Sequence, residues 1–293
     1  GVICGHIHLL PIAWLAARGA GVPLLLIVHV IEARDPSDKW LANRLVPAID
    51  AFVSVSEYTK QQVVRWAEVD PEKGHVVPNC IDRSRFGPGA APSYLKDRYG
   101  LHDRTVMLTL GRLPVQEKRK GHDEMLEVLP DLAAEVPDLT YLVCGDGADR
   151  DRLKAKARRL GVADRTIFAG YVPEEEKVDH YRAADVFAMP GRTEGFGIVY
   201  LEAMACGVPV VASSADASRE AVRNGKLGTV VDPDDPEDVK AGILSALREP
   251  RGVPDGLDYF SVERFQERWH EVVDKCFRRK ASAMAAKAKN EIR

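Results

Sequence analysis

The second half of the chain alternates short apolar runs with amphipathic stretches, and this alternation constrains the fold more than any other feature. The apolar runs have strand length and many β-branched residues, and the stretches between them have helical periodicity. Regular βα alternation predicts a doubly wound parallel sheet with helices on both faces. The expected strands are Thr105–Leu110, Leu139–Cys144, Thr166–Ala169, Val186–Met189, Pro209–Ala212 and Gly228–Val231, and the expected helices are Lys120–Val136, Arg150–Leu160, Glu174–Ala184 and Pro236–Arg248.

The first hundred residues repeat the scheme with fewer elements. Four strands or fewer make a thin domain, and the sequence opens in mid-pattern, so we expect this domain to be incomplete. A Pro-, Gly- and Ala-rich stretch at 86–92 indicates a linker. We therefore predict an α/β protein with a first domain and linker at 1–97, a second domain at 98–260, and a C-terminal helix with an Ala/Lys-rich tail at 261–293. Aromatic residues share one face of that helix, which predicts that it packs back on the first domain.

Composition narrows the class of partner. The chain has 293 residues, of which 45% are hydrophobic and 29% charged, with a formal net charge of -3. A near-neutral balance argues against nucleic acid as the main partner, because phosphate backbones call for a basic surface. The five cysteines are scattered and form no C-x-x-C pair, which indicates reduced thiols in the cytoplasm. No apolar run reaches the roughly 18 residues that would span a bilayer.

The most specific stretch of the sequence begins at Glu194 and continues to Ala212. It opens at the end of an expected strand, enters an Ala- and Leu-rich helix, stops at Gly207 and returns to a strand. Gly195 and Gly197 leave backbone N–H groups accessible at the helix start, where unsatisfied donors and the macrodipole attract phosphate. On spacing alone, an ordinary crossover with solvated glutamates fits the pattern equally well.

This stretch resembles the Glu-x7-Glu signature of the family-4 retaining glycosyltransferases. The resemblance implies the GT-B architecture, in which two Rossmann-like domains face each other across a cleft. It also implies that Glu194 faces the donor sugar and that Glu202 binds the ribose of the nucleotide. The implied backbone contacts to sugar and phosphates come from Gly195, Phe196, Gly197 and Ile198.

A second match follows the expected strand 105–110. This strand–loop–helix segment resembles the one in which the family clamps the donor diphosphate, and it places those roles on Arg112 and Lys120, with Gly111 opening the loop. Two cations beside a leaving pyrophosphate stabilise charge that develops in the transition state. Lys118 is a weaker candidate because some members have a shorter loop. Taken alone, residues 118–120 fit a solvated basic turn.

Two further loops fit the family in its order along the chain. Gly145 and Gly147 resemble the Gly-x-Gly loop near the nucleotide. Tyr171 and Val172 resemble the segment whose backbone reads the base, with Glu174 nearby. For the Glu174 side chain, a structural role and a donor-binding role fit equally well.

His29 ends an expected strand of the first domain. A lone histidine at a strand end is more often structural, but the family places a histidine that faces the sugar here. The resemblance thus implies four catalytic residues, which are Glu194, His29, Arg112 and Lys120.

The resemblance implies an enzyme that moves a hexose from a UDP- or GDP-sugar to an acceptor hydroxyl with retention of configuration. Residues 1–97 would serve the acceptor, which is a sugar, a lipid-linked or a small molecule, and residues 98–260 would bind the nucleotide sugar. Peripheral membrane contact through a preceding N-terminal region is left open. The alternatives are a nucleotide-sugar-binding module without turnover and a related GT-B enzyme, either an epimerase or a phosphorylase-like enzyme.

We expect neither a cofactor nor a metal. Two Asp-x-Asp triplets occur, Asp149-Arg150-Asp151 and Asp232-Pro233-Asp234. Both stand at expected helix starts, where carboxylates cap the helix and interact favourably with its dipole.

Overall fold

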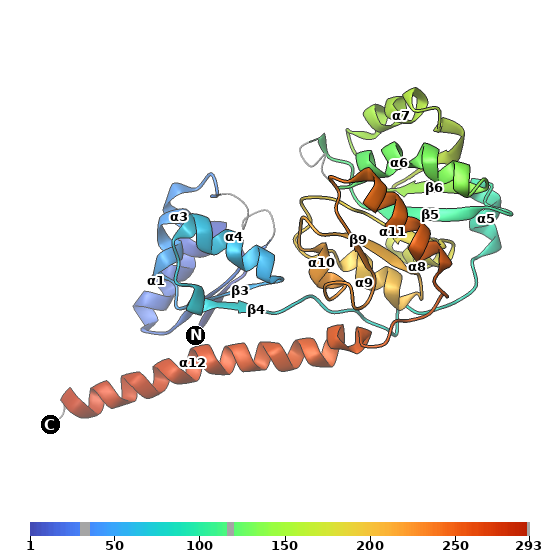
Figure 1. The fold of residues 1–293 in the computed structure, drawn as a ribbon. Coiled ribbons are helices and arrows are strands. Elements are labelled where there is room, and N and C mark those ends of the chain that lie inside the picture. Colours follow the sequence, from blue (N-terminus) through green and yellow to red (C-terminus); the bar gives the residue numbers. More distant parts are fainter. Residues whose placement is uncertain (30–35, 116–119, 292–293) are drawn as a thin grey trace. The chain divides into compact units, whose positions relative to one another are not determined.

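The computed structural model describes residues 1–29, 36–115 and 120–291, which form two compact units (Figure 1). Unit 1 comprises Gly1–Asn79 and Val262–Arg293, and unit 2 comprises Cys80–Ser261. Each unit is built around its own parallel sheet.

The sheet of unit 1 has four parallel strands in the order β1-β2-β3-β4. Because the spatial order follows the chain order and crossovers are right-handed, the connecting helices fall on one face. There Leu24, Leu26 and Phe52 form a core with helix residues such as Leu10 and Val63. The elements are β1 Val2–Cys4, α1 Leu10–Ala20, β2 Leu24–Ile27, α3 Trp40–Leu45, β3 Ala51–Ser54, α4 Glu57–Ala67 and β4 Gly74–Val76, with 3-10 turns at Ile7–Leu9, Val46–Ala48 and Pro71–Lys73.

The other face of this sheet is covered by the C-terminal helix α12, Val262–Glu291. Successive strand residues point to opposite faces, so Leu25 and Val53 point away from the first core. They pack with Val272 of α12, and the half-buried Phe265 and Trp269 join the same cluster. The helix thereby supplies the second layer that a parallel sheet requires.

The sheet of unit 2 has six parallel strands in the order β10-β9-β8-β5-β6-β7. Chain order and spatial order diverge at β5, whose two neighbours are β6 and β8. This is the strand order of a Rossmann fold, as the alternation predicted. The strands are β5 Thr105–Leu110, β6 Leu139–Cys144, β7 Thr166–Gly170, β8 Val186–Ala188, β9 Val210–Ser213 and β10 Thr229–Val231.

Helices cover both faces of this sheet. On one face, Met107, Tyr141 and Val211 pack against α6, α7 and α11. On the other, Phe187 makes edge-to-face contacts with Tyr181 of α8 and Tyr200 of α9. The helices are α5 Ser93–Tyr99, α6 His122–Glu135, α7 Arg150–Arg159, α8 Lys177–Arg182, α9 Ile198–Ala205, α10 Ser218–Ala221 and α11 Pro236–Arg248, with 3-10 turns at Ala163–Arg165, Glu174–Glu176 and Leu257–Phe260.

The contacts divide the two units at Asn79/Cys80, so the linker that the sequence analysis grouped with the first domain belongs by its contacts to unit 2. The Ile81 N–H donates to Phe260 O at 2.9 Å, and the Phe86 ring lies 6.3 Å from that of Tyr181. Arg182 Nε donates to Gly87 O at 3.0 Å. The Pro/Gly-rich composition indicates irregular backbone correctly, but it carries no information about which core the segment packs on.

The α12 contact gives a stability prediction. Replacing the buried Val272 by Asp should lower the unfolding free energy of unit 1 by about 3 kcal/mol, because an unpaired carboxylate would be buried against the sheet. All four tryptophans, at positions 14, 40, 66 and 269, lie in unit 1, so urea unfolding followed by tryptophan fluorescence reports on this unit. His270→Asp, two residues away on the exposed side of the same helix, is the matched control. Equal losses in the two variants would contradict the packing.

Candidate functional site

The reversal of strand order between β5 and β8 fixes where a ligand of unit 2 would bind. In doubly wound sheets, ligands bind at the carboxyl ends of the strands on either side of such a reversal. β5 continues into Gly111 and Arg112, and β8 continues into the loop that contains Glu194. A Cβ on Gly111 would lie 3.8 Å from Met189 Sδ, so these two loops are in van der Waals contact.

The start of α6 lies against the loop after β8. Gly121 has a φ of +89°, and a Cβ there would lie 2.8 Å from Pro190 N, so only glycine allows this approach. The approach brings Lys120 Nζ to 3.6 Å from Glu194 Oε2, with the two side chains only 17% and 19% exposed. Two of the predicted catalytic residues are therefore neighbours in a largely enclosed position.

The Glu194 loop leads into α9 through tightly packed backbone. Gly197 has a φ of +86°, and a Cβ there would lie 2.5 Å from the Tyr200 ring and 3.2 Å from Glu194 Cγ. The Tyr200 hydroxyl donates to Met189 O at 2.6 Å, which closes the loop on itself. Phe196 is buried and its ring lies 5.7 Å from that of Phe260. This packing fixes the start of α9, where Ile198 is partly exposed.

Glu202 lies in the second turn of α9 and is buried. Its Oε2 accepts from the Tyr181 hydroxyl at 2.6 Å, and its Oε1 lies 3.2 Å from Lys177 Nζ. Lys177 is also 3.1 Å from Glu174, which pairs in turn with Arg85 at 2.7 Å. Burial and the adjacent Glu202 carboxylate raise the pKa of Tyr181 well above its usual range. The buried charge of Glu202 is thus compensated by one cation and one hydroxyl.

The two glycines after β6 are needed where backbone meets backbone. A Cβ on Gly145 would lie 1.8 Å from Gly111 O, and one on Gly147 would lie 2.2 Å from Leu113 O. The Gly111 N–H donates to Cys144 O at 2.9 Å, and the Gly145 N–H donates to Gly170 O at 2.8 Å. These bonds hold the ends of β5, β6 and β7 together at one edge of the sheet.

The remaining predicted residues lie at the same edge or in the other unit. Tyr171, which follows β7, is 75% exposed, whereas Val172 is buried. Arg112 is exposed, and Lys118 lies outside the described residues. His29 follows β2 in unit 1, where its Nε2 donates to Gly5 O at 3.0 Å. The predicted residues of unit 2 that the structure describes therefore lie at one edge of its sheet. The hydrogen bond described for His29 is within unit 1.

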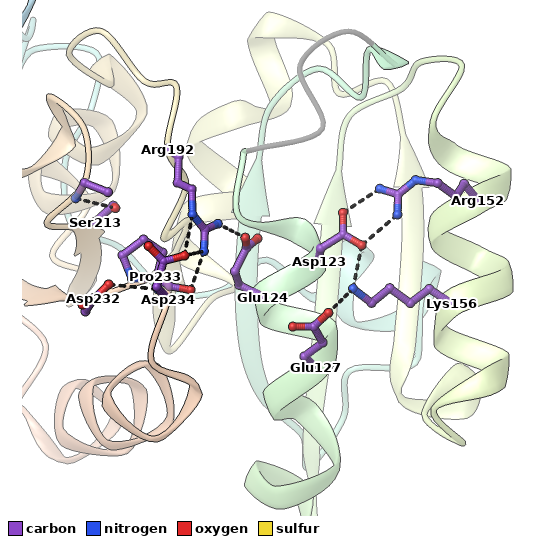
Figure 2. A network of polar contacts seen from close by, with 11 residues as sticks. Asp123, Glu124, Glu127, Arg152, Lys156, Arg192, Ser213, Asp232, Pro233 and Asp234 are labelled. Atoms are coloured by element: carbon purple, nitrogen blue, oxygen red, sulfur yellow. Dashed lines mark hydrogen bonds and ion pairs between the residues drawn. The ribbon is translucent and has the colours of Figure 1, made fainter.

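A polar network supports the loop after β8 (Figure 2). Arg192 contacts Glu124 of α6, and its Nη2 donates to Pro233 O at 2.7 Å and to Asp234 Oδ1 at 2.6 Å. Asp234, the last residue of one Asp-x-Asp triplet, thus serves as the partner of an arginine that anchors this loop.

A second group in the same view joins α6 to α7. Arg152 and Lys156 both contact Asp123 at 2.6 Å, and Arg152 also bonds Asp149 at 2.6 Å. Burial acts to raise the pKa of Asp123, but the hydrogen bonds from these two cations outweigh it and lower the pKa to about 2. Asp149, in the other triplet, is therefore engaged in an ion pair within unit 2.

Sequence reasoning missed Asp216, which follows β9 and is only 1% exposed. Its Oδ2 accepts the Glu194 backbone N–H at 2.8 Å. The signal available in the sequence was the pattern Asp216-Ala217-Ser218, which is typical of a helix cap. Such a pattern predicts the local turn. It does not predict that the second carboxylate oxygen accepts a hydrogen bond from a backbone N–H far away in the sequence.

The close approach at Gly145 yields a prediction. Gly145→Ala should destabilise unit 2 by about 3 kcal/mol, because the added methyl group meets the Gly111 carbonyl and the backbone at Gly145 has a φ of +138°. Urea unfolding followed by circular dichroism measures the loss. Gly252→Ala is the control, since a Cβ at that position would meet nothing within 4 Å. Similar stability of the two variants would show that the loops can separate without cost.

Metal-ligand clusters and membrane-spanning helices are both absent from the described residues. Among residues 1–29, 36–115 and 120–291, no cluster of three or more His, Cys, Asp or Glu side chains is arranged to hold a metal ion. None of the helices in those ranges combines the length and the apolar character needed to cross a bilayer.

Comparison with known proteins agrees with this fold. Residues 95–258 match the family model of glycosyl transferases group 1, and residues 2–85 match that of glycosyltransferase family 4. The solved structure of Anabaena Alr3699/HepE in complex with UDP and glucose superposes with a TM-score of 0.72 at 21% identity, over 92% of this chain and 76% of that one. The lipopolysaccharide outer core galactosyltransferase WaaB gives 0.71 at 18% identity, over 93% and 74%. These likenesses confirm the predicted GT-B fold.

Two curated relatives are more similar in sequence. The GDP-mannose-dependent alpha-(1-6)-phosphatidylinositol monomannoside mannosyltransferase of Mycolicibacterium smegmatis is 40% identical over 224 residues, which cover 74% of this chain and 58% of that protein. The D-inositol 3-phosphate glycosyltransferase 2 of Catenulispora acidiphila is 30% identical over 266 residues, which cover 83% and 61%. The chain thus spans about three fifths of the length of these relatives. With more than half of its residues matched by the family model, the chain belongs to the glycosyl transferases group 1 family.

Proposed function

We propose that this chain carries the donor-binding part of a retaining glycosyltransferase, which moves a hexose from a nucleoside diphosphate sugar to an acceptor hydroxyl. The observation that carries the proposal is the pairing of Lys120 with Glu194 beside the start of α9, at the reversal of strand order. A cation and a helix N-terminus suit a diphosphate, and a carboxylate suits the positive charge that develops on the sugar.

The proposed reaction breaks the bond between the anomeric carbon and the phosphate oxygen and forms a bond from that carbon to the acceptor oxygen. The acceptor attacks the face that the diphosphate leaves, which retains the configuration, and a phosphate oxygen takes the acceptor's proton. Lys120, Arg112 and the N–H groups at the start of α9 would stabilise the leaving diphosphate. Glu194 would stabilise the sugar as the bond to phosphate lengthens, so the protein acts mainly by orientation and charge stabilisation.

Glu202 is suited to bind the ribose. It lies one to two turns from the start of α9; its Oε2 already accepts from a hydroxyl, that of Tyr181, and its Oε1 accepts from the Lys177 ammonium. A ribose hydroxyl could replace the Lys177 contact at Oε1 while the Tyr181 bond at Oε2 remains. The backbone at Tyr171 and Val172 would read the base, and the exposed Tyr171 ring would cover it.

The relatives suggest the donor and the acceptor. The Mycolicibacterium smegmatis relative is named as GDP-mannose-dependent, and both relatives are named for acceptors that contain inositol. We therefore propose GDP-mannose as the first donor to test and an inositol-containing acceptor. A lipid-linked acceptor of this type would bring the protein to a membrane surface.

Donor binding should not need a divalent metal. We expect GDP and GDP-mannose to bind equally well with EDTA and with magnesium, because Lys120, Arg112 and the α9 N–H groups provide the charge that a metal would supply. Isothermal titration calorimetry under both conditions is the measurement, with UDP and UDP-glucose as alternative donors. Binding that disappears in EDTA and returns with magnesium or manganese would contradict the expectation. Binding without any turnover would instead favour a nucleotide-sugar-binding module.

The two glutamates of the signature should differ in kinetic effect. Glu202→Gln should mainly raise KM for the donor, because the ribose is bound equally in the ground and transition states. Glu194→Gln should mainly lower kcat, by about a hundredfold, since a carboxylate near a developing cation contributes on the order of 3 kcal/mol in the transition state.

Steady-state kinetics with GDP-mannose, together with calorimetric donor affinity, separates the two effects. If Glu202→Gln abolishes kcat while Glu194→Gln leaves it near normal, the two roles are reversed. If neither substitution changes either constant, the signature is only a well-packed crossover.

A further inference from the structure

The backbone of Glu194 is held from behind by the turn that follows β9. The Glu194 N–H donates to Asp216 Oδ2 at 2.8 Å, and the Ala217 N–H donates to Glu194 O at 3.0 Å. Both polar groups of the Glu194 peptide backbone are thus engaged by two consecutive residues. Asp216 is almost fully buried, so this contact is shielded from water.

The turn that leads into the short helix α10 uses only one oxygen of the Asp216 carboxylate. Oδ1 accepts the Ser218 N–H at 2.9 Å and the Ser218 hydroxyl at 2.6 Å, which are local bonds two residues along the chain; the N-cap of α10 is Ala217, without a side-chain cap bond. That role needs one oxygen, and a serine or asparagine would fill it. The second oxygen, Oδ2, accepts from the Glu194 loop, which comes from another strand of the sheet.

A buried carboxylate at this position is costly. Burial raises the pKa of Asp216 to about 6, although hydrogen bonds from Ser218 and from the Glu194 N–H lower it, and the Glu194 charge acts to raise it further. The Glu194 charge therefore works against the ionised state of Asp216. The hydrogen bond to the Glu194 backbone offsets part of this cost and gives the residue a role beyond the turn.

We propose that Asp216 is a positioning residue for Glu194. It fixes the peptide at the end of the loop so that the Glu194 carboxylate stays beside Lys120 and is directed toward the donor sugar. This inference rests on the proposed function. Asp216 would contribute to that function only by holding Glu194, without touching the donor itself.

The geometry of the loop shows why such an anchor matters. The Glu194 side chain is held by contacts of moderate length, 3.2 Å from Oε1 to the Gly195 N–H and 3.6 Å from Oε2 to Lys120 Nζ. The next residues include two glycines, which restrain the backbone least. The two short bonds to residues 216 and 217 therefore restrain the Glu194 peptide directly.

The test compares Asp216→Ala with Asp216→Asn and with Asp185→Ala. Asparagine has one side-chain oxygen, so when that oxygen keeps the Ser218 bonds the amide NH2 faces the Glu194 N–H; the turn is kept and the bond to Glu194 is lost. Asp185 is the matched control, because its Oδ2 accepts the Val106 N–H at 2.8 Å and its own N–H donates to Val106 O at 2.8 Å. It makes the same reciprocal contact at the opposite, amino end of the same sheet.

The first readout is amide hydrogen exchange in the intact chain, which needs no activity. Asp216→Ala should speed exchange at the Glu194 amide by about tenfold or more relative to the Val106 amide, and Asp185→Ala should do the reverse. Unchanged exchange at Glu194 in Asp216→Ala would overturn the proposal whether or not the chain transfers sugar.

The second readout is turnover of GDP-mannose. Asp216→Ala and Asp216→Asn should both lower kcat by about thirtyfold and change donor KM by less than about threefold, the pattern expected for Glu194→Gln; a normal kcat in Asp216→Asn would overturn the proposal. Added to Glu194→Gln, Asp216→Ala should cost little more, because it acts through the same residue. Additive losses, or an equal loss in Asp185→Ala, would show a general effect on stability. A wild type that neither binds nor turns over GDP-mannose refutes the proposed function, and the exchange experiment still decides the role of Asp216 in holding Glu194.

Discussion

The pairing of β5 with both β6 and β8 is the constraint on which the rest of unit 2 depends. It reverses the strand order there, so that the helices that follow β5 and β8 lie on opposite faces and their connecting loops separate at one edge. Gly111, Gly121 and Gly145 then allow backbone to meet backbone at that edge, where a side chain would clash in two of the three cases. The pair of Lys120 and Glu194 is a consequence of this packing.

Charge in the site follows from the same close packing. Charged side chains that are removed from water need oppositely charged or hydrogen-bonding partners, and here such groups contact one another in short chains. Glu202 is compensated by Lys177 and Tyr181, and Lys177 is shared with Glu174. Arg192 fixes the loop before Glu194 by contacts to α6 and to the residues after β10 (Figure 2). The result is a set of charged groups whose positions are largely fixed before a ligand arrives, which is the arrangement that charge stabilisation of a reaction requires.

The hydrophobic pattern of the sequence predicted much of the fold. The features that it did not predict have physical causes. The six strands of unit 2 appear within about a residue or two of their predicted bounds, because β-branched runs between turn residues are a local signal. The linker that was grouped with the first domain packs within unit 2, because the segment at 80–92 contacts Phe260, Tyr181 and Arg182, and no local composition encodes those contacts. Asp216 escaped attention because only one of its two carboxylate oxygens serves the local turn.

The sequence by itself determined the α/β class, the family and the residue types available at the carboxyl edge of the second sheet. These depend on periodicity, glycine placement and short motifs, all of which are local along the chain. Only the tertiary structure decided which of those residues meet. Lys120 and Glu194 become neighbours, and Asp216 reaches the Glu194 backbone, because β5, β8 and β9 lie next to one another in the sheet. Contacts between strands depend on their spatial order, which is a property of the whole folded domain.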